Sequence, residues 1–166
     1  MKTDKIYLVG FMGAGKSTVA RALARRLDWR VEDIDEQIEQ RERRDIASIF
    51  RQKGEPYFRA LERQALIDLL PHRGTVVATG GGTFVDPVNR ELMIRDGLVI
   101  WLDVPLSTVL DRVPLDGRRP LAADRGALEG LYNQRLAAYR LAPVRVDASR
   151  GPVDLVVDQI MDGLDS

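Results

Sequence analysis

The fold of this chain is decided by one stretch, Gly10-Phe-Met-Gly13-Ala-Gly15-Lys16-Ser17. It matches the pattern G-x-x-x-x-G-K-[ST] in full. A short apolar run, Ile6-Tyr-Leu-Val9, comes directly before it, and apolar residues recur at helical spacing from Ala20 to Leu27 after it. The glycines of such a loop let backbone N–H groups wrap a phosphate, and the helix N-terminus adds its dipole. The sequence therefore predicts a phosphate-binding loop between a buried strand and a helix.

The side chains of this loop suit a magnesium nucleotide. Lys16 is predicted to neutralise phosphate charge as a catalytic residue, and the Ser17 hydroxyl to face Mg²⁺. The residues that we expect to contact the nucleotide here are Gly13, Ala14, Gly15, Lys16, Ser17 and Thr18. Kinases, GTPases and motor ATPases all share this motif, so by itself it selects no substrate.

Strands and helices alternate along the rest of the chain. Buried-strand patterns occupy Thr75–Ala78 and Leu98–Leu102, and Val144–Val146 is predicted as a short edge strand. Helical patterns are expected at about 35–43, 45–53, from Gly54 onward, after Asp86-Pro87, at 105–112, at 126–140 and behind Pro152. Such alternation implies a parallel sheet covered by helices on both faces. We expect one α/β domain over residues 1–166.

Composition excludes several classes of function. The chain has 166 residues, with 25 Lys plus Arg against 25 Asp plus Glu, no cysteine, and one histidine, His72. The balanced charge argues against nucleic acid as a partner. The lack of cysteine rules out disulfides and thiol catalysis. No apolar run approaches the length of about 18 residues that spans a membrane, and no leader precedes the first strand, so we expect the cytoplasm as the compartment. We also expect a monomer.

Two aspartates end the second strand-like run, Arg30-Val-Glu-Asp33-Ile-Asp35. If the run is a strand to its end, both carboxylates face the same way, toward the Mg²⁺ that the loop serine needs. If a helix begins there, Asp33 is its N-cap and Asp35 a solvated neighbour. Asp103 is a rival metal ligand, because it closes the Leu98–Leu102 run in the usual Walker B pattern.

Three consecutive glycines, Gly80-Gly81-Gly82, follow the strand predicted at Thr75–Ala78. They lie at the carboxyl edge of the sheet, where open α/β sheets bind ligands. We therefore expect a ligand to approach their backbone N–H groups closely. A flexible turn with no ligand is the alternative.

An ordered set of motifs resembles the shikimate kinase family from about residue 5 to residue 160. The set consists of the phosphate-binding loop, Asp33-x-Asp35, Ile49-Phe50, Gly54-Glu55, Phe58-Arg59 with Glu62, Gly80-Gly81-Gly82, Arg119-Pro120-Leu121, and Arg135 followed by Tyr139. The resemblance implies a three-layer P-loop kinase fold of the nucleoside-monophosphate-kinase type, with five parallel strands in the order 2-3-1-4-5. It also implies a mobile lid at about 113–124 and shikimate-binding helices at about 35–65.

The resemblance further implies phosphorylation of the shikimate 3-hydroxyl by MgATP, a step of aromatic amino-acid biosynthesis. Asp33 is implied to hold Mg²⁺ through water, which favours it over Asp103. The residues implied to hold or surround shikimate are Asp35, Phe50, Phe58, Arg59, Glu62, Gly80, Gly81, Gly82 and Arg135.

The same family pattern assigns the other end of the nucleotide. Arg119 matches a lid arginine that reaches the phosphates, which makes it a third catalytic residue beside Lys16 and Asp35. Arg112 matches an arginine that stacks on adenine. Arg150 is a further expected nucleotide contact, and Pro152 is expected near the other face of the base.

The chemistry of the residues agrees with this substrate. Shikimate carries one carboxylate and three hydroxyls, which suit guanidinium forks and carboxylates respectively. Arg135 lies on the apolar stripe Leu128–Tyr139, an odd place for a solvated arginine, whereas Arg59 could simply pair with Glu62 one turn away. With no cysteine and no usable histidine, Asp35 is the candidate to accept or orient the proton of the attacking hydroxyl.

Four features depart from the family pattern. Ile34 stands where a small hydroxyl residue is usual, the turn at Arg43-Arg44 lacks a glycine, Ala122 replaces a leucine, and the stretch 146–152 is short. They bear on the adenine loop and the lid. Two rival readings remain: a kinase of the same fold that phosphorylates gluconate or a nucleoside monophosphate, and a catalytically idle relative that acts as a sensor or partner domain.

Overall fold

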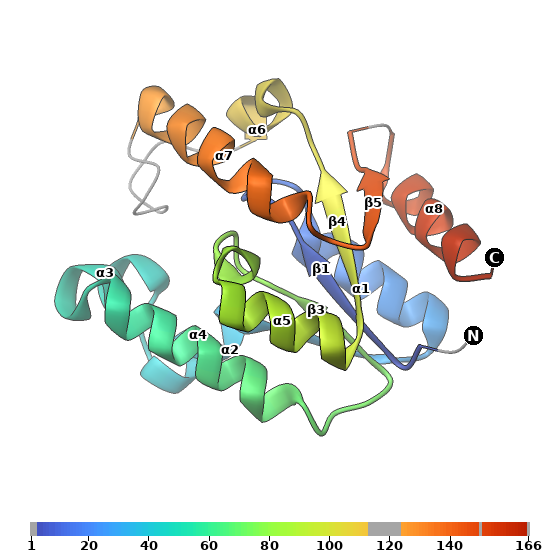
Figure 1. Cartoon of the computed structure of the whole chain (residues 1–166), viewed down its shortest axis with the longest axis horizontal. Helices are drawn as coiled ribbons and strands as arrows, with labels where there is room; N and C mark the ends of the chain where they lie inside the picture. Colours follow the sequence, from blue (N-terminus) through green and yellow to red (C-terminus); the bar gives the residue numbers. More distant parts are fainter. Residues whose placement is uncertain (1–2, 113–123, 150, 166) are drawn as a thin grey trace.

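The computed structural model describes residues 3–112, 124–149 and 151–165 of the chain. Within these ranges five parallel strands form one sheet in the order β2-β3-β1-β4-β5 (Figure 1). The strands are β1 (Lys5–Val9), β2 (Arg30–Asp33), β3 (Thr75–Ala78), β4 (Leu98–Asp103) and β5 (Val144–Asp147). The predicted strand order is confirmed, and so is the edge position of the last strand.

Helices connect the strands throughout the described part of the chain. They are α1 (Lys16–Leu27), α2 (Ile34–Glu42), α3 (Ile46–Lys53), α4 (Glu55–Leu69), the short 3₁₀ helix η1 (Thr83–Val85), α5 (Pro87–Asp96), α6 (Leu106–Arg112), α7 (Arg125–Tyr139) and α8 (Val153–Asp165). The helices whose ranges were predicted from the sequence, at about 35–43, 45–53, 105–112 and 126–140, lie within two residues of those ranges, whereas η1 was not predicted.

The sheet lies between two helical layers. The chain moves one way across the sheet from β1 to β2 and the opposite way from β2 to β3, so right-handed crossovers place α1 and α4 on opposite faces. Figure 1 shows α1 behind the sheet and α4 and α5 in front of it, and α8 packs beside α1. The three-layer α/β architecture that the sequence predicted is confirmed.

Local sequence signals fix where the helices begin. The Asp86 carboxylate accepts hydrogen bonds from the backbone N–H groups of Val88 (2.8 Å) and Asn89 (3.2 Å), with Pro87 at the first helical position. Asp124 caps α7 in the same way, through a 2.7 Å bond from Ala127. The predicted lid at 113–124 therefore ends on a helix cap, and its other residues lie outside the described ranges.

The stretch after β2 decides between the two alternatives left open for its aspartates. β2 ends at Asp33 and α2 begins at Ile34, so the run is not a strand to its end. The reason is the Asp33 side chain, which accepts a 3.1 Å hydrogen bond from the backbone N–H of Glu36 and caps α2. Asp35 therefore lies in the first turn of a helix and not on a strand.

The most buried strand carries the phosphate-binding loop. All five residues of β1 are buried, and β3 and β4 flank it, with Tyr7 opposite both Val77 and Val99. The carboxyl ends of the strands point to one edge, from which Gly10, Asp33 and Gly80 continue the chain. We call this the carboxyl edge and the opposite one the amino edge. No helix in the described ranges is long and apolar enough to cross a membrane.

Candidate functional site

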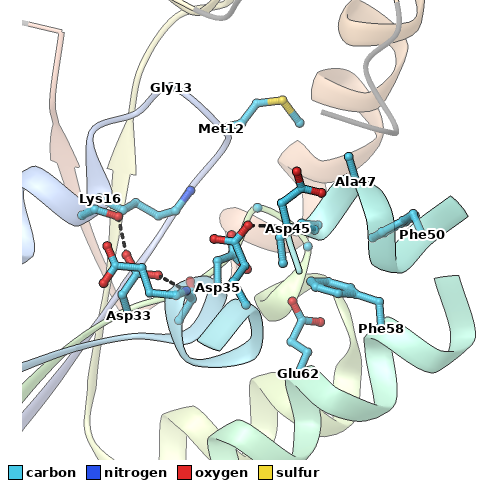
Figure 2. Close-up of a pocket in the computed structure, with 18 of the residues that line it drawn as sticks. Met12, Gly13, Lys16, Asp33, Asp35, Asp45, Ala47, Phe50, Phe58 and Glu62 are labelled. Carbon is cyan, nitrogen blue, oxygen red and sulfur yellow. Dashed lines mark hydrogen bonds between the residues drawn. The ribbon is translucent and has the colours of Figure 1, made fainter. Parts of the chain in front are cut away.

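A cleft of about 740 Å³ opens at the carboxyl edge of the sheet. Figure 2 shows side chains from the phosphate-binding loop, from the start of α2 and from α3 and α4 converging on it. The predicted site residues that line it are Gly13, Gly15, Lys16, Ser17, Thr18, Asp33, Asp35, Phe50, Phe58, Arg59, Glu62, Gly80, Gly81, Gly82 and Arg135. Ala14, within the loop, is buried and is not among the lining residues.

The loop backbone has the shape that its glycines predict. Gly15 has a φ of +89° and caps the N-terminus of α1, a conformation that a side chain would strain. Gly10 passes so near β4 that an added Cβ would lie 2.7 Å from the carbonyl oxygen of Leu102. The Lys16 ammonium donates to the carbonyls of Gly10 (2.6 Å) and Phe11 (3.0 Å), so it lies along the inside of the loop where a phosphate would sit.

Ser17 and Asp33 meet beside the loop. The Ser17 hydroxyl donates a 2.6 Å hydrogen bond to one carboxylate oxygen of Asp33, while the other oxygen caps α2. Asp33 is thus both the helix cap and a neighbour of the loop serine. These two hard oxygen donors fit Mg²⁺, and in the described residues no group of three or more His, Cys, Asp or Glu competes for a metal. Phosphate oxygens and water would complete the shell.

Asp103, the rival metal ligand, points elsewhere. Its carboxylate accepts a 2.7 Å hydrogen bond from Nε of Arg145 on the neighbouring strand β5. It is not among the described residues that line the cleft. The geometry therefore favours Asp33.

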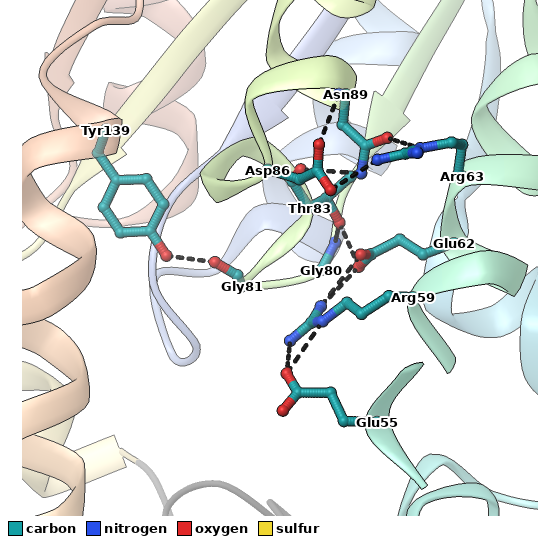
Figure 3. Close-up of polar contacts among 10 residues, drawn as sticks. All are labelled: Glu55, Arg59, Glu62, Arg63, Gly80, Gly81, Thr83, Asp86, Asn89 and Tyr139. Carbon is teal, nitrogen blue, oxygen red and sulfur yellow. Dashed lines mark hydrogen bonds and ion pairs between the residues drawn. The ribbon is translucent and has the colours of Figure 1, made fainter. Parts of the chain in front are cut away.

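Arg59 projects from α4 and is held by carboxylates on its own helix (Figure 3). One nitrogen donates to both oxygens of Glu62, at 3.0 and 3.2 Å, and the guanidinium also pairs with Glu55 at 3.1 Å. Burial alone would lower the pKa of Arg59, but the Glu62 and Glu55 carboxylates outweigh it and the pKa is raised. The predicted alternative, pairing with Glu62, is real, and it coexists with a position on the cleft wall.

Arg135 reaches the cleft from α7 and is 6% exposed. Its guanidinium lies 5.8 Å from the centre of the Phe11 ring. Burial lowers the pKa of Arg135, and the nearby Arg59 guanidinium acts in the same direction. Two guanidinium groups facing one cavity make a favourable place for an anion.

The triple glycine, Gly80-Gly81-Gly82, lies close to the charged ends of three side chains. The closest approaches of an added Cβ are Gly80 to Asp35 Oδ1 (2.8 Å), Gly81 to Arg135 Nη1 (2.8 Å) and Gly82 to Arg59 Nη1 (2.6 Å). Contacts under 3.0 Å cannot be kept without movement, and here the atoms that would move are the charged ends of flexible side chains. A larger residue at any of the three positions would therefore displace a charged group of the site, which the flexible-turn alternative does not explain.

Two aromatic rings close the far end of the cleft. Phe50 of α3 and Phe58 of α4 lie 5.0 Å apart between ring centres. Figure 2 shows Phe58 beside Glu62, with Phe50 farther away on α3. They supply an apolar wall next to the charged groups, as expected for a site that takes a carbocyclic ring.

The nucleotide end is only partly within the described residues. Arg112, at the end of α6, donates a 3.0 Å hydrogen bond to the carbonyl of Gly13, so it lies against the phosphate-binding loop. Pro152 is exposed just before α8 and does not line the cleft. Arg119 and Arg150 lie outside the described residues.

Two residues that support the site were not predicted as part of it. The Thr83 hydroxyl donates to Glu62 at 2.7 Å and accepts from the N–H of Gly80 at 3.0 Å. The Tyr139 hydroxyl donates to the carbonyl of Gly81 (Figure 3). Both hold the triple glycine in place. Tyr139 belonged to the family motif with Arg135 but was given no role, and the signal for Thr83 was its place directly after the glycines.

Comparison with known proteins identifies the family. A family model described as shikimate kinase matches residues 12–165. The chain belongs to the shikimate kinase family. It is 45% identical to a shikimate kinase of Sulfurihydrogenibium sp. over 94% of this chain and 95% of the relative. It is 43% identical to a shikimate kinase of Persephonella marina over 94% and 96%.

A solved member of the shikimate kinase family has nearly the same fold. The shikimate kinase from Acinetobacter baumannii in complex with shikimate superposes with a TM-score of 0.93 at 34% identity, covering 98% of this chain and 93% of that one. The family recognised from the ordered motifs is confirmed.

Proposed function

We propose that this protein transfers the γ-phosphate of ATP to the 3-hydroxyl of shikimate and acts as a monomer in the cytoplasm. The observation that carries the proposal is the cleft itself. There the phosphate-binding loop faces Asp35, Arg59 and Arg135 across the triple glycine. A substrate with one carboxylate and several hydroxyls matches that set of groups. Family membership makes shikimate the expected acceptor.

The acceptor is oriented by charge at one end and by shape at the other. Arg59 and Arg135 are proposed to bind the carboxylate, with Phe50 and Phe58 packing beside the ring. This places the hydroxyls toward Asp35 and the loop. Phosphoryl transfer has a loose transition state, so positioning the two substrates in line accounts for most of the catalysis.

Lys16 and Ser17 are proposed to serve the nucleotide. Lys16 leaves its loop carbonyls to neutralise the β- and γ-phosphates, and the N-terminus of α1 points its N–H groups at them. Ser17 and Asp33 would hold Mg²⁺, which when bound neutralises charge on the phosphates. Arg112 is proposed to contact the adenine, and Arg119 remains a predicted phosphate contact.

Asp35 is proposed to accept or orient the proton of the attacking hydroxyl. Asp35→Asn keeps the shape but removes charge and basicity, so we expect kcat to fall by at least about 10²-fold. ATP affinity, measured by calorimetry, is expected to stay within about threefold, because Asp35 faces the acceptor. Glu36→Gln, the neighbouring carboxylate on the cleft wall, is the matched control. Near-normal kcat in Asp35→Asn at saturating shikimate would leave Asp35 a binding residue only.

The proposed activity is tested by ADP release from MgATP with shikimate, gluconate, nucleoside monophosphates or no acceptor. Among these acceptors we expect only shikimate to support ADP release. The mass and the ³¹P spectrum of the product should identify shikimate 3-phosphate. Turnover with another acceptor only would move the protein to a different kinase activity. Binding of both substrates without turnover would make it a catalytically idle relative. Analytical ultracentrifugation tests whether the protein is a monomer in solution.

A further inference from the structure

Glu62 is a buried carboxylate with partners on two sides. It is 1% exposed, deep in the wall between α4 and the triple glycine. On the cleft side it accepts both bonds from Arg59, at 3.0 and 3.2 Å. Its Oε2 atom also accepts a 2.7 Å hydrogen bond from the Thr83 hydroxyl (Figure 3). The direction in which Arg59 points therefore depends on where Glu62 is held.

The Thr83 hydroxyl joins two elements of the site. Thr83 is fully buried, and its Oγ1 atom accepts from the backbone N–H of Gly80 at 3.0 Å while its proton goes to Glu62. Gly80 belongs to the loop after β3, whereas Glu62 and Arg59 belong to α4. One hydroxyl thus connects the glycine that faces Asp35 to the carboxylate that holds Arg59.

The backbone of Thr83 is itself fixed. Its carbonyl accepts a 3.2 Å bond from the side-chain amide of Asn89, which is 1% exposed. Arg63 of α4 binds Asn89 at 3.2 Å and the helix cap Asp86 at 2.6 Å. A second link between α4 and η1 therefore holds Thr83 whether or not its hydroxyl is present. Loss of the hydroxyl should change Glu62 and Gly80 without moving the helix.

We infer that Thr83 is a positioning residue for the acceptor, acting through Glu62 on the orientation of Arg59 and through Gly80 on the triple glycine. The inference rests on the proposed function, since it concerns the shikimate side of that site. Without the hydroxyl, the buried N–H of Gly80 loses its acceptor, and Glu62 Oε2 loses its shorter bond and keeps only the 3.2 Å bond from Arg59. Glu62 then shifts to recover a donor, and Arg59 moves with it.

Thr83→Val and Thr83→Ser separate the hydroxyl from the shape of the residue. Val keeps the volume and removes the hydroxyl, whereas Ser keeps it. We expect Thr83→Val to raise the Kd for shikimate about tenfold and to leave the Kd for ATP within twofold. Thr83→Ser should stay within about twofold of the wild type for both ligands. Calorimetry gives all four values.

Thr75→Val is the matched control, because Thr75 is as fully buried, at the amino edge, where its hydroxyl donates to the carbonyl of Arg73 at 3.0 Å. It should lower stability and leave the shikimate Kd unchanged. A double-mutant cycle with Glu62→Met tests the route. If Thr83 acts through Glu62, adding Thr83→Val to the Glu62→Met variant should raise the Kd for shikimate by less than about threefold.

Three outcomes would overturn the inference. They are an unchanged shikimate Kd in Thr83→Val, an equal loss for ATP and shikimate, and failure of Thr83→Ser to restore affinity. Each is distinct from failure of the proposed function, because in that case the wild-type protein would already lack shikimate-dependent turnover.

Discussion

The same β-strands carry a buried charged cluster at each end, and the two clusters differ in what surrounds the cations. At the carboxyl edge, Arg59 and Arg135 face a cleft. At the amino edge, Lys5 is 0% exposed and its ammonium lies 2.8 Å from the Asp96 carboxylate. Burial of charge is therefore common to both edges and does not by itself mark the binding site.

The amino-edge cluster is closed by its own partners. Asp96 accepts from Lys5, from the Tyr7 hydroxyl at 2.7 Å and from Arg73 at 2.7 Å. Burial would raise the pKa of Asp96, but these hydrogen bonds together hold it below its usual value. Lys5 also donates to the carbonyl of Leu69. This cluster joins the start of β1 to the ends of α4 and α5, so its role is structural.

The carboxyl-edge cluster is open by comparison. The Arg135 guanidinium lies over an aromatic ring, and burial lowers its pKa. Burial therefore disfavours the positive charge of Arg135, whereas an anion bound in the cleft would stabilise that charge. A buried cation with a lowered pKa beside a cleft is a better sign of function than a buried cation alone.

The largest expected effect is at the closed end. Lys5→Met removes the cation but leaves Asp96 and the Leu69 carbonyl with fewer donors, so we expect a loss of about 3 kcal/mol in unfolding free energy. For a chain of this length that is a fall of roughly 6–12 °C in Tm. Urea unfolding measures it, with the exposed Lys53→Met as control. The Kd for shikimate should not change; a loss of binding with normal stability would contradict the division between the two edges.

The matching change at the open end should have the opposite pattern. Arg135→Met keeps the apolar stripe of α7 and removes a charge-assisted contact, so the Kd for shikimate should rise about 10- to 100-fold. ATP affinity should be kept. Since no buried charge remains to be desolvated, the unfolding free energy should be unchanged or higher. Calorimetry and urea unfolding test both parts, with Arg140→Met, exposed on the same helix end, as control. Equal losses for ATP and shikimate would argue against a carboxylate-binding role.

The two edges also differ in how far the sequence predicted them. The loop glycines, Asp33, the triple glycine and Arg135 each carry a local signal, a motif or a break in an apolar stripe, and the structure brings them to one cleft. Lys5 carries none, because a lysine at the start of a strand is usually solvated. Its partner Asp96 comes from a distant helix, and only the folded sheet brings them together.

Thr83 and Asp33 illustrate the same limit. The hydroxyl of Thr83 bonds a carboxylate 21 residues earlier in the chain, so its role follows from tertiary structure. Asp33 was open to two local interpretations, strand end or helix cap, and the structure combines them, with one oxygen on Glu36 and the other on Ser17. Local patterns predicted most of the elements, and together with the family resemblance they predicted many residues that line the cleft, but not which partners these residues have.

The smallest expected effect concerns pH at the closed end. Burial, and then the hydrogen bond to Asp96, raise the pKa of Tyr7 above its ordinary value near 10. A group whose pKa is raised on folding adds stability that is complete below the unfolded pKa and is lost as pH rises beyond it. The lowered pKa of Asp96 acts only in acid, where stability falls as pH drops below about 4. The cluster should therefore be insensitive to pH between these limits.

Tyr7→Phe isolates this contribution. Burial also raises the pKa values of Tyr132 and Tyr139, and the hydrogen bond to Glu42 raises that of Tyr57, so wild-type stability should fall steeply above pH 10. Removing one such group should reduce the loss between pH 10 and 11 by about 1 kcal/mol, because each raised group contributes about 1.4 kcal/mol per pH unit once it titrates when unfolded. Urea unfolding at several pH values gives the slope. If Tyr7→Phe lowers stability equally at pH 8 and pH 11, Tyr7 contributes its hydrogen bond to Asp96 and no pH dependence.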